Sequence, residues 1–201
     1  MNFPYINGVA FKEISDYVID TDVKTINFNC IQNNYIIWSK TEFIEEFFNF
    51  ISTTDKQVIL ITHCSDHDIN EQRFLKKPKN VVKWFAQNVN FKHPDLIPIP
   101  IGIENHTGPH KGSRTDASYL ASETFIDRPI INKILSPMYC NFTFTNTNRI
   151  KTLDILRNKN IVYIDKLKPF AEYCEKMKQF LFVASPPGNG IDCHRTWEAL
   201  Y

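Results

Sequence analysis

The sequence predicts an α/β protein built on parallel sheets. Two observations support this prediction. Short apolar runs bounded by Gly, Pro and Asn recur along the chain, and residues 58–62 (VILIT) are apolar except for Thr62, as in a strand buried on both faces. Segments with helical periodicity stand between many of these runs, and such alternation implies parallel strands joined by right-handed crossovers. Residues 180–184 (FLFVA) are a second run of this buried kind.

The first half of the chain supplies most of the expected strands. Residues 1–23 have little periodicity and are expected to form an irregular lead-in that ends in a short strand. Ser39 and Glu42 fit a helix capping box, and apolar residues at 43, 44, 47, 48 and 51 continue it as an amphipathic helix. Residues 32–34 are expected to form a turn. The strands expected in this half are 17–19, 24–28, 35–38, 58–62, 81–85 and 96–101.

The second half is expected to form a separate domain. Within residues 106–128 every period is interrupted by Gly108, Pro109, Gly112 and Ser113 and by three basic side chains, so this segment is expected to join two domains. We place the boundary near residue 132, which gives domains 1–131 and 132–201. The elements expected after it are a strand over 138–144, a helix over 148–158, a strand over 161–164, a helix over 169–178 and a strand over 179–184.

Composition narrows the classes of function. The chain has 201 residues, and its net charge of +1 gives no basic surface for nucleic acid. The N-terminus does not resemble a signal peptide, and no window approaches 18 uninterrupted apolar residues, so we expect a cytoplasmic chain that does not insert into a membrane. The five cysteines are far apart and form no C-x-x-C pair, which favours reduced thiols.

The segment after residue 184 has the residues of an anion-binding loop. The glycine-containing stretch 185–190 (SPPGNG) precedes a helix for which Asp192 is the expected N-cap. Backbone N–H groups at such a helix start attract phosphate, Arg195 is placed to contact a diphosphate, and Glu198 is placed to accept hydrogen bonds from ribose. An ordinary connecting loop with a solvated charged face has the same pattern. We expect this helix to have two different faces. The apolar face is made of Cys193, Trp197 and Leu200, and the charged face is made of His194, Arg195 and Glu198.

A second cluster of reactive side chains follows the run 58–62. It comprises His63, Asp66, His67 and Asp68, which are able in principle to ligate a metal or to run acid–base chemistry. The cluster lacks the H-E-x-x-H spacing of zinc sites, and Asp66 or Asp68 is equally suited to cap a short helix.

Residues 185–201 (SPPGNGIDCHRTWEALY) closely resemble the donor-sugar segment of exostosin-like glycosyltransferases, whose pattern is S-P-R-G-x-G-x-D-x-H-R-x-W-E-A-L. Residues 60–66, 83–88 and 99–105 are similar to stretches of the acceptor-side domain of those enzymes, and 139–149 is similar to the segment that opens their donor domain. The chain departs from the pattern at Pro187, where the family usually has a basic residue. It also stops inside the last helix, and we therefore expect an incomplete donor domain with little or no activity.

The resemblance implies a GT-B glycosyltransferase that transfers a hexose or pentose for glycan biosynthesis. It implies an N-terminal Rossmann-like acceptor domain and a nucleoside diphosphate sugar held in the cleft between the domains. The substrates would be this nucleotide sugar and the hydroxyl of a glycan or glycoconjugate. The transfer would invert the configuration of the sugar and would need no metal or other cofactor. Asp66 and Glu104 are candidates for the catalytic base by position alone. The donor-binding residues expected are Ser185, Gly188, Asn189, Gly190, Asp192, His194, Arg195 and Glu198.

Two other functions stay open at this point. The chain is also consistent with a non-catalytic fragment that binds a nucleotide or a partner protein. A more distant alternative is a metal-assisted hydrolase that uses His63, Asp66, His67 and Asp68. The sequence leaves homo-oligomerisation open.

Overall fold

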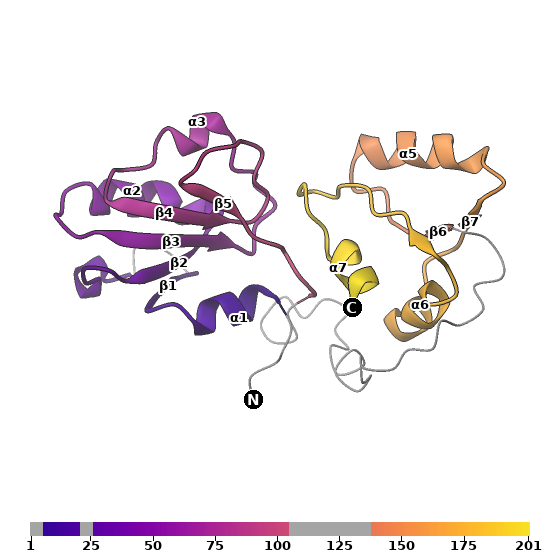
Figure 1. Cartoon of the computed structure of the whole chain (residues 1–201), viewed down its shortest axis with the longest axis horizontal. Coiled ribbons are helices and arrows are strands. Elements are labelled where there is room, and N and C mark those ends of the chain that lie inside the picture. The colour runs from indigo at the N-terminus through magenta and orange to yellow at the C-terminus, as the bar shows by residue number, and fades with distance from the viewer. Residues whose placement is uncertain (1–5, 21–25, 105–137) are drawn as a thin grey trace. The chain divides into compact units, whose positions relative to one another are not determined.

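A computed structural model describes residues 6–20, 26–104 and 138–201 (Figure 1). The fold is α/β with two parallel sheets, consistent with a Rossmann-like arrangement, which confirms the predicted fold class. The chain divides into two compact units, the first containing residues 1–101 with 190–192 and the second containing 102–189 with 193–201. The expected joining segment and the boundary near residue 132 lie outside the described residues.

The first unit contains a sheet of five parallel strands that follow each other in chain order. Each strand pairs with the one before it, and the register aligns Trp38 with Ile61 and Ile61 with Phe85. The strand expected over 24–28 is wrong in its described part: a 3₁₀ turn, η2 (Phe28–Cys30), forms instead because the side chain of Asn27 accepts a hydrogen bond from the backbone N–H of Asn29. The strands are β1 (Tyr17–Ile19), β2 (Ile36–Lys40), β3 (Val58–His63), β4 (Val81–Ala86) and β5 (Leu96–Pro98).

Helices cover both faces of this sheet, with α1 on the face opposite to α2 and α3 (Figure 1). The helix α1 (Gly8–Glu13) lies where an irregular lead-in was expected, and Asn7 caps it by accepting from the backbone N–H of Ala10 at 2.9 Å. The amphipathic helix is confirmed as α2 (Ile44–Ile51), preceded by the 3₁₀ turn η3 (Thr41–Phe43), and its apolar face is buried. The short helix α3 (Glu71–Phe74) follows β3.

The predicted caps of these helices are wrong, because their side chains have other partners. Ser39 lies inside β2, and its hydroxyl donates to the carbonyl of Lys40 instead of capping a helix. Glu42 accepts a hydrogen bond from the hydroxyl of Ser65 at 3.0 Å. Asn70, not Asp66 or Asp68, caps α3, since its side chain accepts from the backbone N–H of Arg73.

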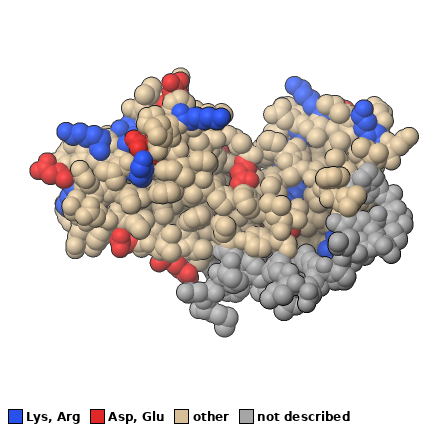
Figure 2. All heavy atoms as spheres, viewed as in Figure 1, with Lys and Arg blue, Asp and Glu red and all other residues tan. Residues whose placement is uncertain are grey.

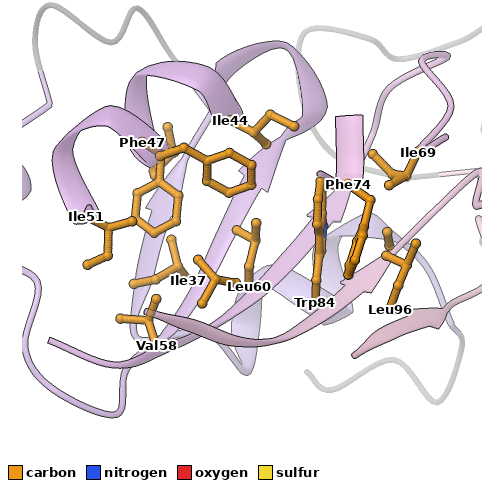
Figure 3. Close-up of a cluster of buried hydrophobic side chains, with 14 of the residues drawn as sticks. Ile37, Ile44, Phe47, Ile51, Val58, Leu60, Ile69, Phe74, Trp84 and Leu96 are labelled. Carbon is orange, nitrogen blue, oxygen red and sulfur yellow. The ribbon is translucent and has the colours of Figure 1, made fainter. Parts of the chain in front are cut away.

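The core of the first unit lies between the sheet and helices α2 and α3 (Figure 3). The ring of Trp84 packs against Phe74, with centroids 6.2 Å apart, and Phe48 meets the same indole edge-on at 5.5 Å. The indole N–H of Trp84 donates to the buried hydroxyl of Thr62 at 2.9 Å, so the polar atom of this large side chain is satisfied.

The second unit contains a smaller parallel sheet in the order β7-β6-β8. The chain passes from β6 outward to β7 and then returns to the other side of β6, so the strand order reverses between β6 and β8. Ligands of open α/β sheets bind outside the carboxyl ends of the strands at such a reversal. The elements are β6 (Met138–Cys140), α5 (Thr147–Arg157), β7 (Val162–Ile164), α6 (Phe170–Met177), β8 (Phe182–Val183) and α7 (His194–Leu200).

The expectation of a strand buried on both faces over residues 180–184 is wrong. Among the described residues β8 pairs with β6 alone, which makes it an edge strand. Leu181 and Phe182 are exposed, whereas Phe180 and Ala184 at the two ends of the run are buried.

Charged side chains of both signs are scattered over the visible face of the molecule and form no single-sign patch there (Figure 2). This distribution is consistent with the net charge of +1. No helix within residues 6–20, 26–104 and 138–201 has the length and hydropathy needed to cross a membrane.

Candidate functional site

The loop after β8 is anchored by a buried arginine. Arg149, in the first turn of α5, donates from Nε to the carbonyl of Pro187 at 2.9 Å and from Nη1 to the carbonyl of Thr143 at 3.0 Å. Its Nη2 makes a longer contact of 3.4 Å with the carbonyl of Pro186. The guanidinium therefore joins the segment after β6 to the loop after β8, at the point where the strand order reverses.

Asn146 supports the same loop from the N-cap of α5. Its Oδ1 accepts from the backbone N–H of Arg149, and its Nδ2 donates to the carbonyls of Pro187 and Gly188. A Cβ atom on Gly188 would lie 2.9 Å from Nη2 of Arg149, so the close approach of the loop depends on this glycine. The sequence did not identify Asn146 or Arg149 as anchors. The only sequence signal for these two residues was that they lie in segment 139–149, which resembles the start of the donor domain of exostosin-like enzymes. That resemblance did not indicate what the two side chains contact.

Residues 190–192 belong to the first unit, where they contact Asn88. The side chain of Asn88 donates to the carbonyl of Ser65 and accepts from the backbone N–H of Asp192, both at 2.9 Å. A Cβ atom on Gly190 would lie 2.6 Å from Nδ2 of Asn88. The carboxylate of Asp192 accepts from the backbone N–H of Ile101 at 2.8 Å. The prediction that Asp192 caps α7 is therefore wrong, and Cys193 is the N-cap residue.

The charged face of α7 is more buried than the apolar one, and Cys193, His194 and Trp197 are only half-buried. Arg195 and Glu198, expected on the charged face, are 4% and 3% exposed, which excludes the alternative of a solvated face, whereas Leu200, expected on the apolar face, is 72% exposed. The guanidinium carbon of Arg195 lies 6.0 Å from the ring centroids of both Phe142 and Tyr173. The helix thus buries its two charged residues, and the guanidinium packs against aromatic rings.

Arg195 is a buried cation with an unused hydrogen-bond donor. Its Nε is buried and makes no hydrogen bond to any of the described residues. Burial of a charge costs several kcal/mol unless that charge is well paired, so a buried guanidinium with an unused donor calls for an explanation. Burial raises the pKa of the Cys140 thiol at the end of β6, and the nearby positive charge of Arg195 opposes that rise.

Other residues connect α7 to its surroundings. The hydroxyl of Ser185 lies 2.8 Å from the hydroxyl of Thr196 and 3.1 Å from the sulfur of Cys193, which ties the start of the loop to the first turn of the helix. Nδ1 of His194 lies 2.8 Å from the carbonyl of Gly102, and since a carbonyl only accepts, Nδ1 carries the proton. Asn189 is exposed at the tip of the loop.

The expected donor-binding residues therefore fall into two groups. Gly190 and Asp192 belong to the first unit and are held by Asn88 and Ile101. The second unit holds Ser185, Gly188, Asn189, His194, Arg195 and Glu198.

The two candidates for the catalytic base lie in different units. Asp66 is exposed in the loop after β3 and belongs to the first unit. Glu104 is half-buried a few residues after β5 and belongs to the second. Their assignment stays a prediction.

The cluster at residues 63–68 is not assembled as a metal site. His63 is buried, with Nδ1 accepting from the backbone N–H of Cys64 at 2.8 Å and Nε2 within 3.0 Å of the carbonyl of Pro100. The backbone turns sharply at Cys64, where φ is 56°, and Asp66 and His67 beyond it are exposed. Within the part of the chain that the structure describes, no three His, Cys, Asp or Glu side chains are grouped to hold a metal.

Comparisons with known proteins do not place this chain in a family, since it matches no family model and no curated protein.

Proposed function

We propose that this chain provides the nucleoside diphosphate sugar site of a glycosyltransferase similar to the exostosin-like enzymes. The observation that carries the proposal is the burial of Arg195 and Glu198 on the helix that follows a glycine-containing loop, beside the reversal of strand order in the second sheet. The resemblance of residues 185–201 to the donor segment of those enzymes supports the same assignment.

The chemistry of sugar transfer accounts for such a buried cation. An acceptor hydroxyl attacks the anomeric carbon, a base removes its proton, and the bond to the nucleoside diphosphate breaks with negative charge left on that group. A guanidinium shielded from water interacts more strongly with this charge than a solvated one, because the local dielectric is lower. Arg195 is proposed to fill this role, and Glu198 is proposed to accept hydrogen bonds from the ribose hydroxyls.

The anchored loop supplies preorganisation for the same step. Arg149 and Asn146 hold the carbonyls of residues 186–188 on the side of α5. A loop that is already ordered loses little conformational entropy when a ligand binds, so more of the contact energy appears as affinity. Asp66 and Glu104 are the proposed bases, by position.

Calorimetric titration with UDP and GDP tests the proposal. The variant Arg195→Met keeps an unbranched side chain and removes the charge, so affinity should fall by about 10- to 100-fold, as for the loss of a hydrogen bond to a charged group. Arg157→Met, at the exposed end of α5, is the matched control, because it makes the same change of net charge away from the loop. Thermal unfolding of both variants establishes whether the fold is intact.

Three results would contradict the proposal. One is the absence of UDP and GDP binding to the unmodified chain, and another is equal affinity in the wild type and a folded Arg195→Met variant. The third is a dependence of binding on divalent ions, because a site that relies on Arg195 should bind equally well in the presence of a chelator. A sugar-transfer assay then distinguishes a transferase from a protein that only binds the nucleotide.

A further inference from the structure

Aromatic rings, and not carboxylates, hold the side chain of Arg195. Its guanidinium carbon lies over the rings of Phe142 and Tyr173, 6.0 Å from each centroid. Arg195 makes no ion pair with any residue that the structure describes. An aromatic face attracts a guanidinium without neutralising it, whereas a carboxylate neutralises the charge and accepts its N–H groups. The rings therefore leave the positive charge and the unused Nε–H of Arg195 to a ligand.

Tyr173 offers a rigid surface to this guanidinium. It lies in the first turn of α6, is 5% exposed, and donates its backbone N–H to the carbonyl of Pro169 at 2.9 Å. Its ring packs against Tyr139 in β6 and against Phe170, with centroids 6.0 and 6.1 Å away. Side chains packed in this way stay close to one rotamer, so the ring keeps its place whether or not a ligand is bound.

The second ring, that of Phe142, serves two arginines. The guanidinium carbon of Arg149 lies 5.8 Å from its centroid, so a replacement of Phe142 would act on the anchor of the loop as well as on Arg195. The anchoring residues Asn146 and Arg149 belong to the start of α5. Tyr173 comes from α6, and its replacement therefore leaves both of these residues in place.

The distance of 6.0 Å indicates how the ring acts. This separation is at the outer limit of a cation–π contact, so the direct attraction is weak and the main effect is on the freedom of the arginine. Immobilising a rotamer-rich side chain during binding lowers affinity about two- to tenfold. An arginine that already rests on Tyr173 has lost this freedom before the ligand arrives.

We propose that Tyr173 is a positioning residue of the nucleotide-sugar site. Its ring holds the guanidinium of Arg195 in place for the diphosphate, and Tyr173 itself does not touch the ligand. The inference rests on the proposed function and adds to it a residue that lies outside every segment resembling the exostosin-like enzymes. The aromatic ring is the part of Tyr173 that this role requires.

Titration of the full chain with UDP, GDP and inorganic pyrophosphate tests the proposal. Tyr173→Leu removes the aromatic face and should weaken binding of the preferred nucleotide about three- to tenfold. Pyrophosphate should lose the same factor, because Tyr173 acts through Arg195 and not on the base. Tyr173→Phe keeps the ring and should bind like the wild type. Tyr163→Leu is the matched control, because it takes a ring away from another cation of the second unit, Lys176, whose Nζ lies 5.0 Å from that ring.

A double-mutant cycle separates positioning from a general structural role. In the Arg195→Met background, Tyr173→Leu should change the remaining affinity by less than about twofold, because the guanidinium on which it acts is gone. An equal loss in both backgrounds would overturn the inference. If Arg195→Met binds too weakly to be measured, the comparison of Tyr173→Phe with Tyr173→Leu decides, since equal losses in these two variants exclude a role of the ring.

The outcomes also separate this inference from the proposed function. Binding that falls in Arg195→Met but is unchanged in a folded Tyr173→Leu variant overturns the role of Tyr173 and leaves the proposed function standing. No binding of UDP or GDP to the wild type overturns both. Thermal unfolding establishes that each variant is folded, and Tyr173→Met, with its adaptable side chain, replaces Tyr173→Leu if the latter is not.

Discussion

Gly190 is the position where a single methyl group should have the largest predictable effect. A Cβ atom there would stand 2.6 Å from Nδ2 and 2.9 Å from Oδ1 of Asn88. Asn88 cannot simply move aside, because it is buried and both ends of its amide are hydrogen-bonded. Its Nδ2 donates to the carbonyl of Ser65, and its Oδ1 accepts from the backbone N–H of Asp192. The replacement Gly190→Ala therefore forces the loss of these two bonds.

The size of the effect follows from two opposing contributions. Two hydrogen bonds at a net value of about 1 kcal/mol each contribute about 2 kcal/mol to folding. The φ angle of Gly190 lies outside the left-handed region, so alanine fits the backbone and gains about 0.4–1 kcal/mol by restricting the unfolded chain. The net loss of unfolding free energy should be about 1–1.5 kcal/mol, a shift of roughly 0.5–1 M in a urea midpoint.

A double-mutant cycle identifies the clash as the cause. Asn88→Gly removes the obstructing amide, and glycine tolerates the φ of 56° at that position. In this background Gly190→Ala should be neutral or stabilising by a few tenths of a kcal/mol, which reverses the sign seen in the wild type. Equal destabilisation in both backgrounds, or none in either, would refute the contact with Asn88 as the reason for this glycine.

Two further predictions concern the second unit. Arg149→Ala removes the anchors of three carbonyls and should lower the unfolding free energy by about 2–4 kcal/mol in urea titration; a loss below 1 kcal/mol would contradict its anchoring role. Burial, and secondarily the charge and hydrogen bond of Asp165, raise the pKa of Tyr139 in the folded state. The contribution of Tyr139 to the unfolding free energy is therefore complete below about pH 10, its pKa in the unfolded chain, and is lost progressively above that pH. In Tyr139→Phe the unfolding free energy should decline less steeply over the same pH range. Identical pH profiles of stability for the two proteins would contradict this role of Tyr139.

The elements that the sequence predicted correctly are those in which local pattern and tertiary burial agree. Val58 to Ile61 and the face of α2 that contains Phe47 are apolar and are buried in any arrangement that forms a core, so the sequence pattern is sufficient to identify them. Helix α1 was missed because it is six residues long, too short to show a helical period, although Asn7 is a good cap residue.

The errors arise where a long-range partner competes with a local one. Asp192 was expected to cap the helix beside it, but its carboxylate bonds to Ile101, which is far away in the sequence. The spacing of residues in α7 defines two faces but not which of them is buried, because that depends on the rings of Phe142 and Tyr173. The apolar cavity of the second unit that Phe142, Phe144 and Leu167 line likewise could not be predicted, since its lining comes from separate segments that meet only in the folded chain.

The strand order of the first sheet has a consequence for how the protein is made. Because every strand from β2 to β5 pairs with its immediate predecessor, the sheet can grow by one strand at a time as the chain leaves the ribosome. The hydrogen bonds of Asp192 to Asn88 and Ile101 bridge about ninety residues or more, so they form only after residue 192 has been synthesised. The first unit can thus begin to fold early, yet it is completed only when residues 190–192 join it.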